Sequence, residues 1–467
     1  MLIRDAELAP GLRGDLRLAQ GRIAECAPHL LPGPDEPVVE ARGAALLPGL
    51  HDHHLHLRAL AAALASVRCG PPEVRDASGL AAALRTASAA LAPGEWLRGT
   101  AYHESVAGDL DGAALDALLP DRPLRLQHRS GRLWIFNRAA LEALAPDAEA
   151  PLERRDGRWT GRLYDADDWL RTRLRPRPVG LQAASRWLAA RGVTGVTDTT
   201  HHNGPEALAG FAEARARGEL LQTLRVMGDA RLDPVDGLAG VQRGEHKFHL
   251  HEHALPDWDG LLAAIRASHA AGRGTAFHCV TRTELVYALS ALREAGVHAG
   301  DRIEHAAVAP PELADELARL RLTVVTQPNF VGERGDEYRR EVAAQDQPWL
   351  YRLRGLMAAG VPLALSTDAP FGAAEPWAAM RAAVTRRTPE GAVLGPDEAL
   401  APAAALAGFL APLEAPGAPP RTLAAGVPAD LCLLDRGWDA ALADLGAVQV
   451  RRTWCQGRLV YDAALSG

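Results

Sequence analysis

Two histidines separated by one residue, His54 and His56, form the first pattern in the sequence that could support catalysis. They lie in an apolar segment, residues 47–56, that we predict to be a β-strand. Alternate residues of a strand share one face, so the two imidazoles would point the same way, about 6.7 Å apart along the chain. Such a pair suits one divalent ion such as zinc, but histidines also gather by composition, and the pattern alone is not specific.

A single lysine is the second chemical feature. The chain contains 51 lysine and arginine residues, and Lys247 is the only lysine among them. A codon bias explains the arginines but does not explain the lysine, which is either incidental or functional. A lysine amine can lose its charge on burial and then form a covalent bond, whereas a guanidinium stays charged. Lys247 is therefore a candidate functional residue.

Three further side chains of the same chemical kind, His278, His305 and Asp368, lie in apolar segments later in the chain. One histidine on an apolar strand is more often a hydrogen-bonded core residue than a ligand. Several such strands, together with a carboxylate, indicate a metal site if the fold brings their ends together.

The elements that must position these residues alternate between apolar strands and alanine-rich helical segments, a pattern typical of βαβ units and a parallel sheet. Eight strands close a (β/α)₈ TIM-type barrel, in which catalytic groups lie at the carboxyl ends of the strands. Lys247 then falls on the fourth strand. The eight predicted strands are residues 47–56, 193–200, 223–229, 246–251, 275–280, 301–307, 322–329 and 362–369.

Both ends of the chain carry short alternating β segments, with predicted turns at Gln20-Gly21 and Gln456-Gly457. We predict one small β-domain built from residues 1–43 and 420–467, and a barrel built from residues 44–60 and 180–419. The interval 61–179 is too long for a crossover helix and holds strands of its own, RPLRLQH and GRLWIFN. It is predicted to be an inserted α+β subdomain that caps the barrel.

The composition argues against several classes of partner. A net charge of −7 and the lack of a basic run exclude a typical nucleic-acid or anionic-membrane surface. No apolar stretch reaches the roughly 18 residues of a spanning helix, and the first residues do not resemble a signal peptide. Five widely spaced cysteines argue against a disulfide framework. We expect a cytoplasmic protein with a small-molecule substrate and leave a homodimer open.

The ordered series of motifs resembles the amidohydrolase superfamily, and within it the branch of N-substituted formamide deformylase-like proteins. The resemblance covers nearly the whole chain and is specific for the superfamily but not for a substrate. It implies a metal-binding barrel flanked by a small β-sandwich. The motifs are PGLHDHHLHL, the strand-four lysine, AFHCVTRTELVYAL, DRIEHA, VTQPNF, STDAPFG, AVTRRTPEGAVLGPDEAL and GVPADLCLLDR.

The same resemblance implies roles for the six candidate residues. His54, His56 and Asp368 would bind the more buried of one or two divalent ions, zinc being the first expectation, and His278 and His305 would bind the second. Lys247, carbamylated by CO₂, would bridge two ions. Asp368, Lys247 and His305 are the predicted catalytic residues. Asp368 would act as the general base for water that hydrolyses an amide-type C–N bond, in an N-acyl or N-formyl compound for example.

Four side chains are predicted to contact substrate: His249, which shares a strand face with Lys247, Gln327 after strand seven, and Arg132 with Tyr102 in the insertion. Arg132 follows Gly131 where the family usually has histidine, so that it could bind an anionic group. The alternative is that Arg132 is one of many surface arginines.

Two other functions stay open. A mononuclear deaminase or deiminase of the same superfamily would lack the strand-four lysine and carry a glutamate three residues after the strand-five histidine, where this chain has Thr281. A non-catalytic scaffold on the same fold would have lost ligands, whereas this ligand set is complete. One barrel fold hosts many activities, so the fold by itself does not distinguish these functions.

Overall fold

The structure is a computed structural model that describes residues 1–174 and 179–465. The chain forms two compact units, one made of Met1–Leu57 with Leu181–Gly467 and the other of Arg58–Gly180. Helix α1 (Leu57–Leu64) begins where the first unit ends. No helix in the described ranges is both long enough and apolar enough to cross a membrane.

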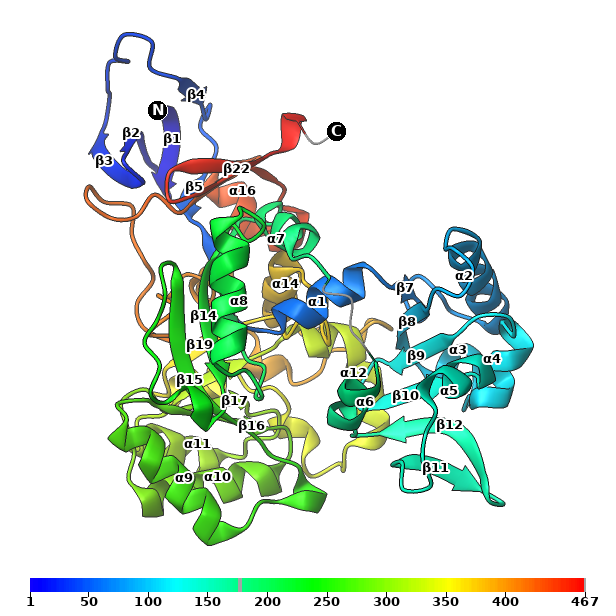
Figure 1. Cartoon of the computed structure of the whole chain (residues 1–467). Coiled ribbons are helices and arrows are strands. Elements are labelled where there is room, and N and C mark those ends of the chain that lie inside the picture. The colour runs from blue at the N-terminus through cyan, green and yellow to red at the C-terminus, as the bar shows by residue number, and fades with distance from the viewer. Residues whose placement is uncertain (175–178, 466–467) are drawn as a thin grey trace. The chain divides into compact units, whose positions relative to one another are not determined.

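An eight-stranded parallel sheet is the centre of the first unit, and it confirms the predicted barrel (Figure 1). Its order along the sheet follows the chain, from β6 at one edge to β19 at the other. The edges meet at their carboxyl ends, where the Asp368 N–H donates to the His54 carbonyl (2.8 Å) and the His56 N–H to the Ala369 carbonyl (2.7 Å). The strands are β6 (Leu50–Leu55), β13 (Val193–Asp198), β14 (Thr223–Gly228), β15 (Val241–His249), β16 (Thr275–Cys279), β17 (Arg302–His305), β18 (Thr323–Thr326) and β19 (Leu363–Leu365).

Strand β19 is shorter than predicted and ends at Leu365, and the left-handed backbone of Asp368 (φ 56°) lies within the remainder of the predicted strand. Its carboxyl side is therefore a loop that runs from Ser366 toward Phe371.

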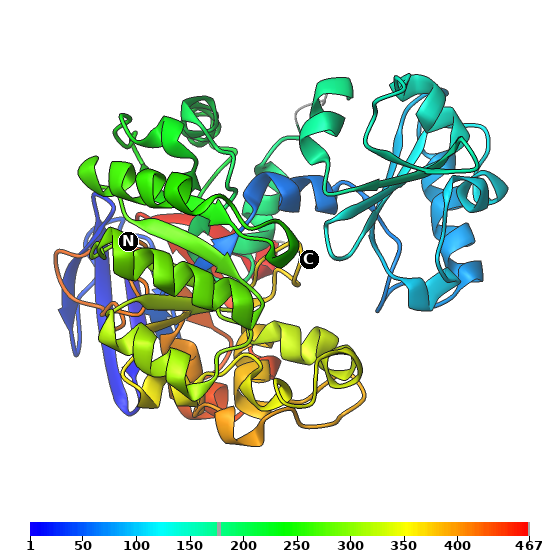
Figure 2. The ribbon, with the colours of Figure 1, turned by 90° about the horizontal axis from the view of Figure 1, so that it is seen from below.

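Helices cover the outer face of the barrel, and Figure 2 shows them around the strands. Helix α10 begins with a capping box, in which the Thr281 side chain accepts from the Glu284 N–H and the Glu284 carboxylate accepts from the Thr281 N–H. Its buried residues, Leu285 and Leu289 among them, join a core with β16, β17 and the neighbouring helices. The helices are α7 (Gln182–Ala189), α8 (Pro205–Ala216), α9 (Trp258–Ala270), α10 (Arg282–Ala295), α11 (Pro311–Arg319), α12 (Asn329–Glu341), α13 (Arg354–Ala358), α14 (Pro376–Thr385), α15 (Pro402–Ala407) and α16 (Trp438–Ala443).

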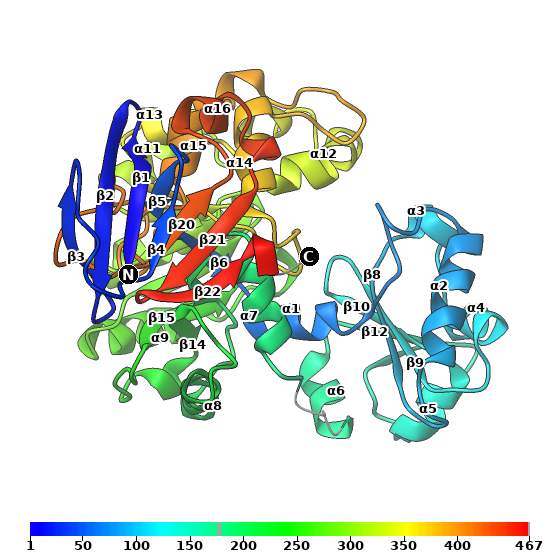
Figure 3. The ribbon, with the colours of Figure 1, turned by 90° about the horizontal axis from the view of Figure 1, so that it is seen from above.

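The two chain ends build a pair of four-stranded sheets in orders β3-β2-β1-β4 and β22-β21-β20-β5 (Figure 3). Ile3 and Leu16 from one end share a buried core with Leu431 and Trp454 from the other, so the predicted β-sandwich is confirmed. Both predicted turns have positive φ at their two central residues, as type I′ hairpins require. The strands are β1 (Leu2–Ala9), β2 (Leu12–Ala19), β3 (Arg22–Ala27), β4 (Val38–Glu40), β5 (Leu46–Pro48), β20 (Leu431–Leu434), β21 (Val450–Cys455) and β22 (Arg458–Asp462).

The second unit is a six-stranded sheet of order β11-β12-β10-β9-β8-β7 packed against short helices. The two strands predicted in this interval are β9 and β10. The strands are β7 (Val67–Arg68), β8 (Leu97–Tyr102), β9 (Leu124–His128), β10 (Leu133–Phe136), β11 (Leu152–Arg155) and β12 (Arg158–Tyr164). The helices are α2 (Ala77–Ala89), α3 (Glu104–Ala107), α4 (Gly112–Leu118), α5 (Arg138–Leu144) and α6 (Asp167–Arg173).

Candidate active site

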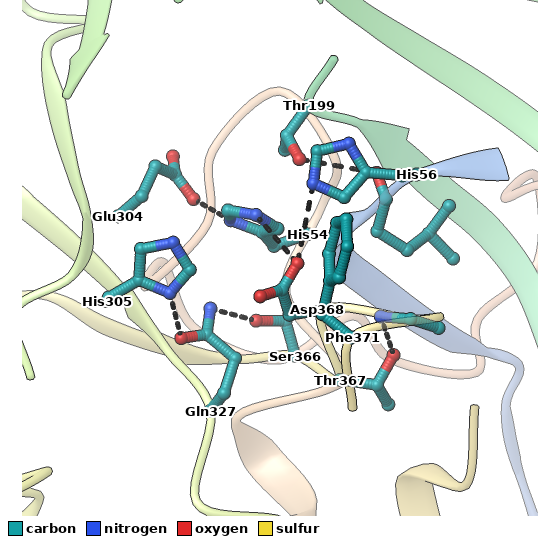
Figure 4. A network of polar contacts seen from close by, with 12 residues as sticks. His54, His56, Thr199, Glu304, His305, Gln327, Ser366, Thr367, Asp368 and Phe371 are labelled. Carbon is teal, nitrogen blue, oxygen red and sulfur yellow. Dashed lines mark hydrogen bonds and ion pairs between the residues drawn. The ribbon is translucent and has the colours of Figure 1, made fainter. Parts of the chain in front are cut away.

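The carboxyl ends of β6 and β19 bring His54, His56 and Asp368 together (Figure 4). The Nε2 atoms of the two histidines lie 3.3 and 3.4 Å from the same oxygen of Asp368, Oδ1. One ligand atom from each of the three residues lies within 4.8 Å of the others. The three side chains can therefore converge on one metal ion without a change of backbone.

Two residues of the site have positive φ angles, a backbone conformation that residues other than glycine rarely adopt. His305 has φ 69° and Asp368 has φ 56°. Such conformations cost on the order of 1–3 kcal/mol each and persist only where the surroundings enforce them. Beside Asp368, the buried Asp52 carboxylate accepts from the Thr367 N–H (3.1 Å) and hydroxyl (2.5 Å). Together with the β6–β19 backbone bonds, this contact fixes the loop that carries Asp368.

His278 and His305 extend the site along the sheet. The His305 ring centroid is 4.8 Å from that of His54 and 4.5 Å from that of His278. The buried Gln327 accepts from His305 Nδ1 (2.6 Å) through Oε1 and donates to the Ser366 hydroxyl (2.9 Å). Because a carbonyl oxygen can only accept, the proton of His305 is on Nδ1, and its Nε2 lone pair is available to a metal ion.

Glu304 is a site residue that sequence reasoning missed. One of its carboxylate oxygens contacts His54 Nδ1, and the other accepts from Arg302 Nε at 2.5 Å. Burial alone would raise the pKa of Glu304, but Arg302, Lys247 and His54 hold it well below its ordinary value. An ionised Glu304 keeps a proton on His54 Nδ1 and turns the His54 Nε2 lone pair toward Asp368, as metal-ligating histidines require.

Lys247 lies on β15 with only 6% of its surface exposed. Among the described residues its Nζ has no hydrogen-bond partner. Burial lowers its pKa from 10.5 to about 8, and repulsion by Arg302 acts in the same direction. Burying an amine whose N–H groups have no acceptor costs free energy unless another group, such as a ligand, compensates for it. Imidazoles, a carboxylate and this amine together form a donor set that fits one or two divalent metal ions.

The predicted substrate contacts fall in both units. His249 is exposed at the end of β15, and its ring centroid is 4.5 Å from that of His278. Gln327 is fully buried behind His305 and holds that ring. In the second unit Tyr102 is buried and its hydroxyl donates to the Gly108 carbonyl (2.5 Å). Arg132 forms a bidentate pair with Asp165 (2.8 and 2.6 Å). The contact of these four side chains with a substrate stays a prediction.

A second histidine cluster in the inserted unit has a different character. The Nε2 atoms of His103 and His128 lie 3.4 and 3.2 Å from the same oxygen of Glu104. The Nδ1 atoms of these histidines accept from the backbone N–H groups of Ser105 (3.2 Å) and Ser130 (3.1 Å). An Nδ1 that accepts leaves the ring proton on Nε2, so the His128 ring donates to the carboxylate and the His103 ring lies beside it.

A family model described as "Amidohydrolase family" matches residues 37–461. N-substituted formamide deformylase from Arthrobacter pascens is 28% identical over 507 residues, which cover 92% of this chain and 90% of that protein. An uncharacterized metal-dependent hydrolase from Pyrococcus horikoshii has a TM-score of 0.74 at 18% identity, with 96% and 98% of the two chains covered. N-isopropylammelide isopropylaminohydrolase from Burkholderia multivorans has a TM-score of 0.52 at 17% identity, with 98% and 97% covered. At these identities the two structures share the fold.

Proposed function

The chain belongs to the amidohydrolase family, and we propose that it hydrolyses an amide-type C–N bond with one or two divalent metal ions bound at the carboxyl end of its barrel. The observation that carries the proposal is the convergence of His54, His56 and Asp368 within 4.8 Å, close to a buried lysine without a hydrogen-bond partner among the described residues. A hydrolase of this kind is consistent with the relatives named as a deformylase and a metal-dependent hydrolase.

The histidines and Asp368 would hold the ions, with His54, His56 and Asp368 on one side and His278 and His305 on the other. Zinc fits this set of nitrogen and oxygen donors. When bound, the metal supplies Lewis acidity that lowers the pKa of water and polarises the scissile carbonyl.

Asp368 is the proposed general base. Burial opposes its ionisation, but His54, His56 and His305 hold the pKa of Asp368 well below its usual range. Its carboxylate would accept a proton from the attacking water as the oxygen–carbon bond forms, and it would pass that proton to the nitrogen as the C–N bond breaks. The products are a carboxylic acid and an amine, so the reaction consumes one water.

Lys247 is the proposed carbamate. The neutral amine would add to CO₂ with loss of one proton, and the anionic carbamate would replace an amine that has no hydrogen-bond partner among the described residues. The lowered pKa of Lys247 favours this reaction, because only the neutral amine has a lone pair to give.

The proposed substrate is a small N-formyl or N-acyl compound, as the name of the curated relative suggests. His249 at the barrel mouth is the proposed contact for its polar groups, and a role of Arg132 in substrate binding stays a prediction. Tyr102 and Gln327 would support neighbouring structure, since their polar atoms are already bonded. We place the reaction in the cytoplasm and treat a homodimer as a further proposal.

Metal analysis of the purified protein, together with a panel of N-formyl and N-acyl amines, tests the proposed function. We expect at least one zinc per chain and release of amine from some member of the panel. A carbon-13 signal after incubation with labelled bicarbonate, lost in Lys247→Arg, would identify the carbamate. A chain that binds no divalent ion would refute the proposal, and release of ammonia from a cyclic amidine would favour the deaminase instead.

A further inference from the structure

A row of imidazoles connects the exposed end of β15 to the proposed metal ligands. His253 and His249 are exposed, and His251 between them is partly buried. Successive ring centroids in this row are 5.7 Å apart (His253–His251), 4.3 Å (His251–His249) and 4.5 Å (His249–His278). The row ends at His278, which is itself 4.5 Å from His305.

His249 is the branching point of this row. Besides His251 and His278, it lies 5.0 Å from the exposed His201, which comes from the loop after β13. The loop after β13 and the end of β15 therefore bring imidazoles to one place at the barrel mouth. A purely solvated loop would not require this arrangement, because solvated side chains have no reason to gather ring against ring.

The distances between neighbouring ring centroids in this row are those expected for two imidazoles that bind the same metal ion. A Zn–N bond is about 2.0–2.1 Å, so two imidazoles on one zinc have centroids within about 6 Å of each other. Within this protein the proposed ligand pair His54 and His56 is 5.7 Å apart, and His278 and His305 are 4.5 Å apart. The pairs that His249 forms with His251 and His201 fall in or near the same range.

We infer that His201, His249 and His251 form a loading path, along which a divalent metal ion is captured at the barrel mouth and passed by ligand exchange to His278. This inference rests on the proposed function in one respect, that the barrel binds metal at all. Each transfer breaks one metal–nitrogen bond as the next forms, and the ion's charge and oxidation state do not change. A site of two histidines binds more weakly than a site of five or six ligands, as a carrier must.

The test follows uptake of Co²⁺ by metal-free protein, using the visible absorption of the bound ion in a stopped-flow experiment. The probe variant is His249→Gln with His251→Gln. The control is His29→Gln with His298→Gln, two histidines outside the row. An ion held at the mouth is at a high effective concentration for His278, so we expect uptake to slow by about tenfold in the probe variant. The control should take up metal at the wild-type rate.

The final Co²⁺ content should be the same in the wild type, the probe variant and the control. Equal uptake rates in all three would overturn the loading path while leaving the proposed function intact. A probe variant that binds metal more weakly at equilibrium would also overturn it, because the two histidines would then be ligands of the final site. A wild-type protein that binds no Co²⁺ and no Zn²⁺ would contradict the proposed function itself.

Discussion

Replacing Glu304 by glutamine should weaken metal binding, although Glu304 is not a proposed metal ligand. Its two carboxylate oxygens face two donors, His54 Nδ1 and Arg302 Nε. A glutamine offers one acceptor oxygen and places an NH₂ group against the other donor. If that NH₂ faces His54, the ring proton must move to Nε2, the atom that faces Asp368, and ligation is blocked. We expect metal affinity to fall by about 10- to 100-fold.

Protein stability should fall as well, which calls for a matched control. Arg302 is 1% exposed and would lose its anionic partner, which costs about 3–5 kcal/mol for a buried pair. Glu245 offers the same change at a carboxylate whose described hydrogen bonds go to Arg225 and not to a proposed histidine ligand. It is 3% exposed, lies on β15 and pairs with Arg225 at 2.8 Å. Glu245→Gln should lower the thermal midpoint to a similar degree and leave metal affinity unchanged.

Competition with a chromophoric zinc chelator measures the affinity of both variants, and calorimetry of the metal-free proteins measures their stability. The positioning role of Glu304 fails if Glu304→Gln binds zinc as tightly as the wild type. It fails equally if Glu245→Gln loses as much affinity, since any loss would then follow from general destabilisation of the barrel.

Three further outcomes can be checked on the same preparations. Asp368→Asn removes the general base and should lower kcat by about 10²- to 10⁴-fold. Part of this loss would come from weaker metal binding. Near-normal turnover would be inconsistent with the proposed mechanism. Lys247→Arg cannot form a carbamate and should bind at most one metal ion per chain, which metal analysis would measure. Two metal ions per chain in this variant would mean that Lys247 is not needed to hold the second ion. Because the pKa of Lys247 is lowered to about 8, the rate at which CO₂-depleted protein regains the carbamate at constant dissolved CO₂ should rise about tenfold per pH unit below about 8 and level off above it. A rate that keeps rising toward the ordinary lysine pKa of 10.5 would show that the amine is not perturbed.

The barrel and the sandwich were predictable because their signals are local. Several barrel strands contain short apolar runs, β19 (LAL) among them, and each terminal hairpin has a Gln-Gly turn whose positive φ values fit a two-residue connection. Strand ends were less predictable. Strand β19 ends at Leu365, before the left-handed backbone at Asp368, and no pattern of apolar residues indicates such a conformation.

The histidines and Asp368 were found from their types and their strands, but their supporting residues were not. Glu304 and His305 are adjacent, and a regular strand would place them on opposite faces. The positive φ at His305 ends that alternation, and both side chains then reach His54. A signal was available, because Arg302 and Glu304 alternate on a strand expected to be buried, which indicates an internal ion pair. Gln327 is buried and hydrogen-bonded behind His305, and its predicted contact with a substrate stays a prediction.

The same buried charges explain why an arginine-rich chain keeps one lysine. One arginine, Arg302, acts on Lys247, and it already has its own carboxylate in Glu304. Arg302 also repels the Lys247 amine, which has no hydrogen-bond partner of its own among the described residues. An arginine at position 247 would carry a permanent charge into this buried layer, where the nearby Glu304 carboxylate already contacts Arg302 and His54. A lysine can release its proton and, as the proposed carbamate, would supply an anionic ligand to bound metal. Selection for the barrel and selection for its proposed chemistry therefore favour the same side chain.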